Sequence, residues 1–233
     1  MTYKREDGRK QTETRPIDAK VGVVANAVGS AMFRIGKTIA YAAVYGPREL
    51  YPKFLQDPSK GVLRCNYNMM PFASSGERSR PGPNRRAKEI SMVTEKALLP
   101  AIDLSKFPNA VVDVFIELPQ CDAGSRCAGI CAASMALADA GIVMKDLVSA
   151  VAVGRVEDQI LVDLNYIEDS YEGGADIPVA MMPSTGKVTL LQMDGVIKKE
   201  QLKKALELAH ETCKHIYEVQ KSALKQKFGV GSK

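Results

Sequence analysis

The sequence predicts an α+β fold, because strand patterns and helix patterns follow one another in blocks and do not alternate strictly. Short runs of small and β-branched residues open the chain, and an amphipathic helix pattern and an alanine-rich helix pattern follow. A second group of strand patterns then precedes one long amphipathic helix. The 233 residues suffice for one large domain or for two small domains that share an interface.

The first elements are expected to form a meander of short strands. Positions 1–16 are polar and charged, so we expect them to lie over the surface or to become ordered against a partner. Glycine-containing turns at Gly29-Ser30 and Gly36 bound the strands that follow, and the meander ends at Gly46-Pro47. These strands are predicted over 21–28, 31–35 and 37–44, with another over 62–70, where apolar and polar residues alternate.

The middle of the chain is predicted to hold two helices with a strand between them. A Gly/Pro/Ser-rich stretch over 74–84 excludes regular structure there. Asn84 is a suitable N-cap for a helix over 85–99, and Pro100 stops that helix. An apolar run predicts a strand over 111–118, and the alanine-rich helix is expected over 128–140, where Gly141 ends it.

The last third is predicted to be a second group of strands closed by a helix. The segments expected there are strands over 148–153, 160–164, 179–182 and 187–193, an acidic loop over 168–177, and a helix over 198–225. The pattern favours a division into an N-terminal extension (1–16), a first domain (17–147) and a smaller α/β domain that carries the C-terminal helix (148–233).

Composition excludes several classes of protein. The net charge of +5 only mildly favours a polyanionic partner. Five cysteines without a C-x-x-C pair argue against both a disulfide scaffold and a zinc site, so reduced, partly buried thiols are expected. No apolar run approaches the roughly 20 residues of a membrane-spanning helix, and the N-terminus is charged. We therefore expect a cytoplasmic protein without a membrane partner.

One candidate site is the loop that opens the alanine-rich helix. A helix N-terminus offers free backbone N–H groups and a partial positive charge, which suit an anion. Gly124 permits a close approach of the backbone, the Ser125 hydroxyl can donate, and the Arg126 guanidinium can bind two phosphate oxygens. The alternative is an ordinary helix start in which Ser125 is the N-cap and Arg126 faces solvent.

Two further clusters carry charge on loops. Loop arginines near a helix start suit contacts with a phosphodiester backbone, although they also fit a solvated loop; they are Arg78, Arg80, Arg85 and Arg86. An acidic stretch could hold Mg²⁺ or act as a general acid, and a solvated turn is the alternative; it contains Glu168, Asp169, Glu172 and Asp176. The sequence has no G-x-x-x-x-G-K-[ST], H-E-x-x-H or G-x-S-x-G motif.

Matched in this order, several segments resemble the RNase PH family, and within it the catalytic ring subunits of archaeal exosomes. The resemblance spans about Arg15 to Lys227 and rests on RPIDAKVGVV, VYGPRE, PGPNRRAKEIS, VDVFIELPQCDAGSRCAGICAASMALADAGI and EDSYEGGADIPVAMMP. It implies the RNase PH fold, which is related to the second domain of ribosomal protein S5, with a smaller α/β domain after it.

The resemblance also implies roles for individual residues. Gly124, Ser125 and Arg126 are expected to bind the attacking phosphate. Arg85 and Arg86 are expected to contact the RNA backbone. Lys53 is the nearest match for a basic residue that helps to grip RNA, and Arg48 is the alternative. Asp169 and Asp176 match two aspartates that assist catalysis, with Mg²⁺ as a cofactor. The family pattern places these aspartates one residue closer together, so Asp169 implies a one-residue bulge.

The activity implied is phosphorolytic 3′→5′ degradation of single-stranded RNA, with inorganic phosphate as co-substrate, nucleoside diphosphates as products and tail addition in reverse. The partners implied are a non-catalytic RNase PH-like paralogue, which completes a hexameric ring as a trimer of heterodimers, and RNA-binding cap subunits. Two alternatives stay open on the sequence. One is a homohexameric RNase PH that acts on transfer RNA 3′ ends, and the other is a non-catalytic ring subunit that only binds RNA.

Overall fold

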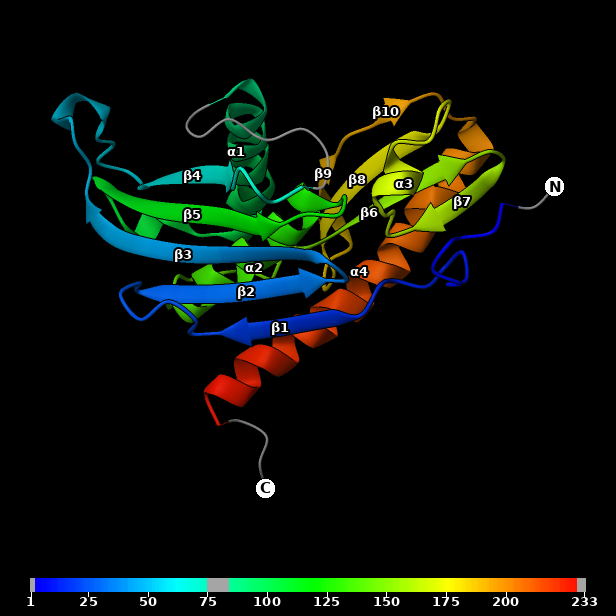
Figure 1. The fold of residues 1–233 in the computed structure, drawn as a ribbon. Coiled ribbons are helices and arrows are strands. Elements are labelled where there is room, and N and C mark those ends of the chain that lie inside the picture. Colours follow the sequence, from blue (N-terminus) through cyan, green and yellow to red (C-terminus); the bar gives the residue numbers. More distant parts are fainter. Residues whose placement is uncertain (1–2, 75–83, 230–233) are drawn as a thin grey trace.

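The computed structural model describes residues 3–74 and 84–229. Two five-stranded sheets lie side by side, and buried residues from both belong to one continuous apolar core (Figure 1). The α+β class that the sequence predicts is confirmed. The loop arginines Arg78 and Arg80 lie outside the described residues.

The first sheet has the strand order β1-β2-β3-β5-β4. Neighbouring strands pair antiparallel except β4 and β5, which are parallel and are connected through α1. Its strands are β1 (Ile17–Val21), β2 (Gly29–Ile35), β3 (Thr38–Glu49), β4 (Val62–Met69) and β5 (Ala110–Gln120). The helices associated with this sheet are α1 (Arg85–Leu98) and α2 (Ser125–Asp139), and short 3-10 turns cover Lys53–Leu55, Leu99–Ala101 and Leu104–Lys106.

The second sheet is antiparallel throughout and has the order β10-β8-β6-β7, with β9 paired to β8. Its strands are β6 (Ser149–Val156), β7 (Gln159–Val162), β8 (Ala175–Met182), β9 (Lys187–Leu191) and β10 (Asp194–Gly195). A one-turn helix, α3 (Tyr166–Asp169), connects β7 to β8. The long helix α4 (Lys199–Lys227) packs on β6, β7 and β8 and reaches β1 of the first sheet (Figure 1).

Helix α2 lies at the centre of the molecule and contacts strands of both sheets. Twelve of its 15 residues are buried, which explains why the segment consists mainly of small residues such as Ala, Gly, Ser and Cys. Gly29 of β2 allows this close packing, because a Cβ there would lie 2.2 Å from the backbone nitrogen of Ala140. The predicted turn at Gly29-Ser30 is therefore wrong, since both residues belong to β2.

Other boundaries also differ from the sequence prediction. The first strand covers Ile17–Val21 and not 21–28, because Gly22, at a φ of +75°, ends it. Strand β3 continues past Gly46-Pro47 to Glu49, with a register shift between Tyr45 and Arg48. The acidic loop over 168–177 includes the end of α3 and the start of β8. The Asn84 cap is confirmed, since its side chain accepts a hydrogen bond from the Ala87 N–H at 2.7 Å.

The N-terminal segment packs more deeply than its composition suggests. Arg5 and Arg15 are only 3% and 5% exposed, although the charged residues of 1–16 were expected on the surface. The carboxylates of Glu168 and Asp163, in the connection between β7 and β8, pair with these guanidiniums and offset the cost of burying them. Within the described residues, no helix combines the length and the apolar character needed to cross a membrane.

Candidate active site

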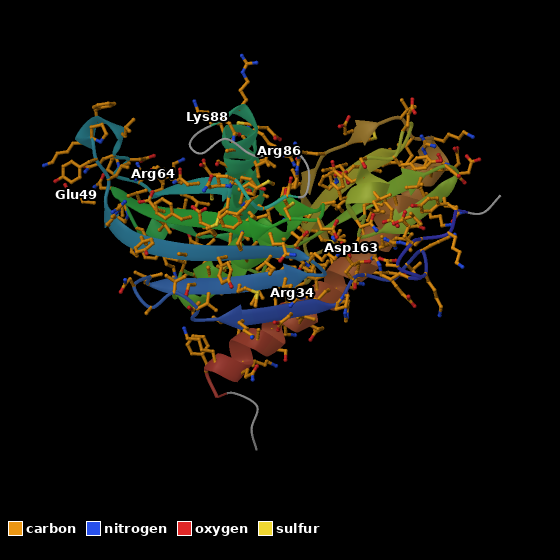
Figure 2. All side chains as sticks on the ribbon, in the orientation of Figure 1. Arg34, Glu49, Arg64, Arg86, Lys88 and Asp163 are labelled. Carbon is orange, nitrogen blue, oxygen red and sulfur yellow. The ribbon has the colours of Figure 1, made fainter. Side chains whose placement is uncertain are left out.

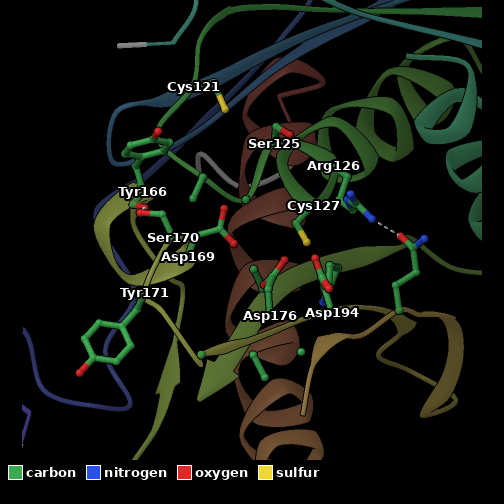
Figure 3. Close-up of a pocket in the computed structure, with 18 of the residues that line it drawn as sticks. Cys121, Ser125, Arg126, Cys127, Tyr166, Asp169, Ser170, Tyr171, Asp176 and Asp194 are labelled. Carbon is green, nitrogen blue, oxygen red and sulfur yellow. Dashed lines mark hydrogen bonds between the residues drawn. The ribbon is translucent and has the colours of Figure 1, made fainter. Parts of the chain in front are cut away.

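A cavity of about 680 Å³ opens where the N-terminus of α2 faces strands β8 and β10 (Figure 3). Six of the residues singled out from the sequence line it: Arg86, Gly124, Ser125, Arg126, Asp169 and Asp176. Arg85 begins α1 beside Arg86 but does not line the cavity. Lys53 lies apart from it, in the turn after β3, where its ammonium is 4.0 Å from the Glu49 carboxylate.

The start of α2 is built as an open helix terminus. Ala123 and Gly124 both have left-handed backbones, with φ of 57° and 65°, so the chain turns sharply between β5 and the helix. Gly124 is the N-cap residue and no side chain in the described part of the chain caps the helix, which leaves its first N–H groups available to a ligand. The Thr38 hydroxyl braces the turn, since it donates to the Ala123 carbonyl at 2.7 Å and accepts from the Asp122 N–H. This geometry suits an anion.

The alternative of an ordinary helix start is wrong on both counts. Gly124, and not Ser125, is the N-cap, and Ser125 is buried. The Arg126 side chain is only 22% exposed and lies in the cavity, with its Nη1 3.7 Å from the Glu89 carboxylate. Nη1 also donates to the side-chain oxygen of Gln192 (Figure 3). The Gln192 Nε2 in turn donates to Glu89 at 3.0 Å. Arg126 is therefore held in place before any ligand arrives.

Three carboxylates face the same cavity. Asp176 is the second residue of β8, Asp169 ends α3, and Asp194 belongs to β10 (Figure 3). Asp169 reaches the cavity although the loop has one residue more than the family pattern, and Gly173 turns that loop with a φ of +73°. Asp194 was not predicted from the sequence as a site residue.

Burial raises the pKa of Asp176 to about 7, and the negative charges of Asp169 and Asp194 add to this, while Arg126 opposes it. Its Oδ1 is buried and has no hydrogen-bond partner among residues 3–74 and 84–229. Burial also raises the pKa of Asp169, and Arg86 and Arg126 oppose that shift. A carboxyl whose pKa is close to neutrality can both keep and release a proton near pH 7, as a general acid must.

No thiol or imidazole of the site is suited to nucleophilic attack. Cys121 and Cys127 line the cavity, and burial raises the pKa of both thiols, so they stay protonated. Neither His210 nor His215 lines the cavity, and both belong to α4. All five cysteines are unpaired, as predicted. Among the described residues, no group of three or more His, Cys, Asp or Glu is arranged to hold a metal ion.

The site residues that the sequence analysis missed are Gln192 and Asp194. Both follow β9 in a stretch without a recognisable motif. They reach the cavity because β9 and β10 pair with opposite ends of β8.

The basic residues Arg64 and Arg48 lie away from this cavity, around the buried carboxylate of Asp113. Figure 2 shows Arg64 near Glu49 at one end of the first sheet, and Asp163 at the junction with the second sheet.

Comparison with known proteins gives consistent matches. Residues 13–143 match the model of the 3′ exoribonuclease family, domain 1 (RNase PH), and residues 146–212 match domain 2 of that family. The chain is 55% identical to the exosome complex component Rrp41 of Pyrococcus furiosus over 97% of its own length and 89% of the relative's. It is 52% identical to Rrp41 of Methanopyrus kandleri over 97% and 93%.

Two solved structures are also similar to it. The crystal structure of rice (Oryza sativa) Rrp46 superimposes with a TM-score of 0.83 at 24% identity, over 95% of this chain and 100% of that one, which supports the fold. The Archaeoglobus fulgidus exosome with RNA bound to the active site gives a TM-score of 0.77 at 25% identity, over 97% and 92%.

Proposed function

The chain belongs to the 3′ exoribonuclease (RNase PH) family, and from this membership we propose how the residues of its cavity remove nucleotides from RNA. It is a phosphorolytic 3′→5′ exoribonuclease subunit, and inorganic phosphate is a substrate of the reaction. Because phosphate and not water attacks the RNA, the enzyme is a nucleotidyltransferase, and hydrolase is an inexact term for it. One observation supports the site most strongly: an open helix terminus, an arginine and a carboxyl with a raised pKa share one cavity.

In the proposed mechanism, Gly124, Ser125 and Arg126 bind orthophosphate. The free N–H groups at the start of α2 and the Arg126 guanidinium supply the donors. An oxygen of orthophosphate forms a bond to the phosphorus of the last phosphodiester, and the bond from that phosphorus to the 3′ oxygen of the preceding nucleotide breaks. The products are a nucleoside diphosphate and an RNA one nucleotide shorter. The reaction exchanges the phosphodiester bond for the phosphoanhydride bond of the diphosphate and is reversible, so excess diphosphate drives tail addition.

Asp176 is the proposed general acid. The departing 3′ oxygen needs a proton, and the raised pKa of Asp176 leaves that carboxyl protonated in a large fraction of molecules at neutral pH. Charge on the phosphoryl oxygens is offset by Arg126 and Arg86, which both line the cavity.

Mg²⁺ is the proposed cofactor. The unpartnered Oδ1 of Asp176 and the neighbouring Asp169 fit a cation that binds one or two protein carboxylates and takes its other ligands from substrate phosphates and water. Asp169 and the ionised form of Asp176 would hold the ion, which would offset negative charge on the phosphoryl groups.

RNA is proposed to reach the cavity along basic side chains. Arg86 lines the cavity, Arg85 precedes it on α1, and Lys53 stands farther out, where its side chain is 71% exposed. Such contacts go to the phosphate backbone and give a grip that is sensitive to salt and indifferent to sequence. We therefore propose single-stranded RNA as the substrate.

Assembly is the remaining part of the proposal. Relatives at 52–55% identity are exosome components, which favours an exosome subunit over a transfer RNA enzyme. We propose a hexameric ring with a non-catalytic RNase PH-like paralogue, bound by RNA-binding cap subunits, in the cytoplasm. Apolar side chains that are at least half exposed follow the β9–β10 edge and support burial against a partner; they are Val188, Leu191, Met193 and Val196.

The test is degradation of radiolabelled poly(A) by this chain alone and mixed with its ring partner, with and without inorganic phosphate. Phosphate-dependent release of nucleoside diphosphate is expected, and excess diphosphate should lengthen the RNA. Arg126→Glu should abolish both reactions, because it places a negative charge at the phosphate site. Lys203→Glu on the exposed side of α4 makes the same basic-to-acidic change outside the cavity and should leave both unchanged. Normal phosphorolysis by Arg126→Glu would disprove the phosphate site, and retained RNA without any diphosphate would favour the non-catalytic alternative.

A further inference from the structure

The N-terminal segment of residues 3–16, named the strap here, lies against the second sheet before the chain enters β1 (Figure 1). Its backbone continues the pairing of β7, since the Val162 N–H donates to the Gln11 carbonyl at 2.8 Å. Two of its arginines, Arg5 and Arg15, turn inward and are buried. Each meets a carboxylate of the connection between β7 and β8.

Arg5 is bound to Glu168 through two parallel hydrogen bonds. Its Nε and Nη2 donate to the two carboxylate oxygens of Glu168, both at 2.8 Å. The remaining capacity of the guanidinium goes to backbone carbonyls, with Val162 at 2.9 Å and Asp163 at 2.8 Å. The two side chains are 2% and 1% exposed, so the pair is shielded from water. This geometry fixes the orientation of both partners.

Glu168 also helps to fix the position of the next residue, Asp169. It forms a capping box with Asn165, in which each side chain accepts a hydrogen bond from the backbone N–H of the other. The resulting single turn of α3 ends at Asp169, whose N–H donates to the Asn165 carbonyl at 2.9 Å. A four-residue helix is too short to be stable alone, so its placement depends on such tertiary contacts.

Arg15 makes the matching connection to the phosphate-binding loop. Its Nε and Nη2 donate to the carboxylate of Asp163 at 2.9 and 2.7 Å. Its Nη1 donates to the backbone carbonyl of Asp122, two residues before Gly124, and lies 3.5 Å from the Asp122 carboxylate. That carboxylate also accepts from the Tyr166 N–H of α3 at 3.1 Å. Arg15 and Asp122 thus join the start of α2 to α3.

We propose that the strap positions the two loops of the active site relative to each other, with Arg5 holding Asp169 through Glu168 and Arg15 holding the Gly124-Ser125-Arg126 loop through Asp122. Both are positioning residues, because neither lines the cavity. The inference rests on the proposed roles of Asp169 and of the phosphate loop. The strap connects elements that stand far apart in the sequence. Losing Arg5 or Arg15 leaves a buried carboxylate with only its longer ion pair to Arg9, at 4.0 Å from Glu168 or 3.3 Å from Asp163.

The test compares Arg5→Lys and Arg15→Lys in the full chain, assembled with whatever partner its activity requires. Lysine keeps the charge but cannot form two parallel hydrogen bonds to a carboxylate. We expect Arg5→Lys to lower kcat about tenfold at an unchanged phosphate KM, because Asp169 shifts and the phosphate loop does not. Arg15→Lys should raise the phosphate KM about tenfold. Lys10→Ala is the control, because this residue of the strap pairs with Glu13 at the surface, 83% exposed.

A second measurement does not depend on activity. Amide hydrogen exchange at α3 should become about tenfold faster in Arg5→Lys and stay unchanged in Lys10→Ala. If the strap only stabilised the fold, both arginine variants would lower the folded fraction, and neither would change kcat or the phosphate KM selectively. Equal effects of the two variants on kcat and on the phosphate KM would therefore overturn the proposal. The proposal would also be overturned if the arginine variants matched Lys10→Ala in their kinetics and in amide exchange at α3. If the wild-type protein showed no phosphorolysis, the proposed function would fall, while exchange at α3 would still decide whether Arg5 holds that helix.

Discussion

Asp194 lies directly opposite Asp176 in the antiparallel pairing of β10 with β8. Directly opposed residues on such strands place their Cβ atoms about 5 Å apart, and like charges in that arrangement repel each other. Figure 3 shows both carboxylates directed into the same cavity below Cys127. The pairing explains part of the raised pKa of Asp176, after the contributions of burial and of Asp169.

Asp194→Asn should shift the pH profile of phosphorolysis. Removing the opposing negative charge stabilises the ionised form of Asp176, so its pKa falls from about 7. Activity that requires protonated Asp176 is lost as pH rises through that pKa, so the alkaline limb of the kcat profile should move to lower pH, by about half a unit to one unit. A profile identical to that of the wild-type enzyme would show that Asp176 is not the proton donor. Asp158→Asn, in an exposed turn, is the matched control.

Asp176→Asn should abolish activity and stabilise the protein at alkaline pH. In the folded state the pKa of Asp176 is raised from its usual 3.8 to about 7, so the folded state binds the proton more tightly than the unfolded state. That stability is fully present below about pH 4 and lost as pH rises through about 7. Asparagine does not ionise, so the variant does not lose this stability as pH rises. The melting temperature of the variant should therefore exceed that of the wild-type protein at pH 8 and approach it at pH 4, when measured with EDTA to exclude metal binding.

Gln192→Ala and Glu89→Gln should change phosphate binding in opposite directions. Gln192 holds Arg126 in place, and its loss frees the guanidinium to adopt other rotamers. We expect the phosphate KM to rise about five- to tenfold, as for the loss of one hydrogen bond. The carboxylate of Glu89 attracts Arg126 from 3.7 Å and competes with phosphate. Glu89→Gln should lower the phosphate KM about two- to fivefold. If the phosphate KM rose in both variants, or fell in both, the roles assigned to Gln192 and Glu89 would be contradicted.

Gly154→Ala should damage both stability and activity. Gly154 pairs with Asp176 across β6 and β8, and a Cβ there would lie 2.3 Å from the Ala175 carbonyl and 2.4 Å from Leu164. The collision should cost about 1–3 kcal/mol of unfolding free energy and displace the strand that carries the general acid. Gly141→Ala is the comparison, because its φ of +72° gives backbone strain while its Cβ would meet no atom within 4 Å. Thermal melts and kcat separate the two effects, since only Gly154→Ala should reduce the activity per folded molecule.

Much of the fold could be predicted from local patterns. Asn84 and the helix after it were predicted, because capping depends on neighbouring residues. Strand β1 and the Gly29-Ser30 turn were predicted wrongly, because Gly29 is required by its contact with α2 and not by a turn. The division of the chain at residues 147 and 148 remains a proposal, as do the roles of the individual site residues.

The sequence by itself determined the class of fold, the family and the motif Gly124-Ser125-Arg126, because each is recognised from local patterns of residues close together in the chain. Only the tertiary structure brought Arg126 to Gln192, set Asp194 against Asp176 and buried Arg5 on Glu168. These contacts depend on the register between strands and on the docking of the strap. Hydrophobic periodicity shows which face of a segment is buried, but it does not specify which distant side chain that face meets.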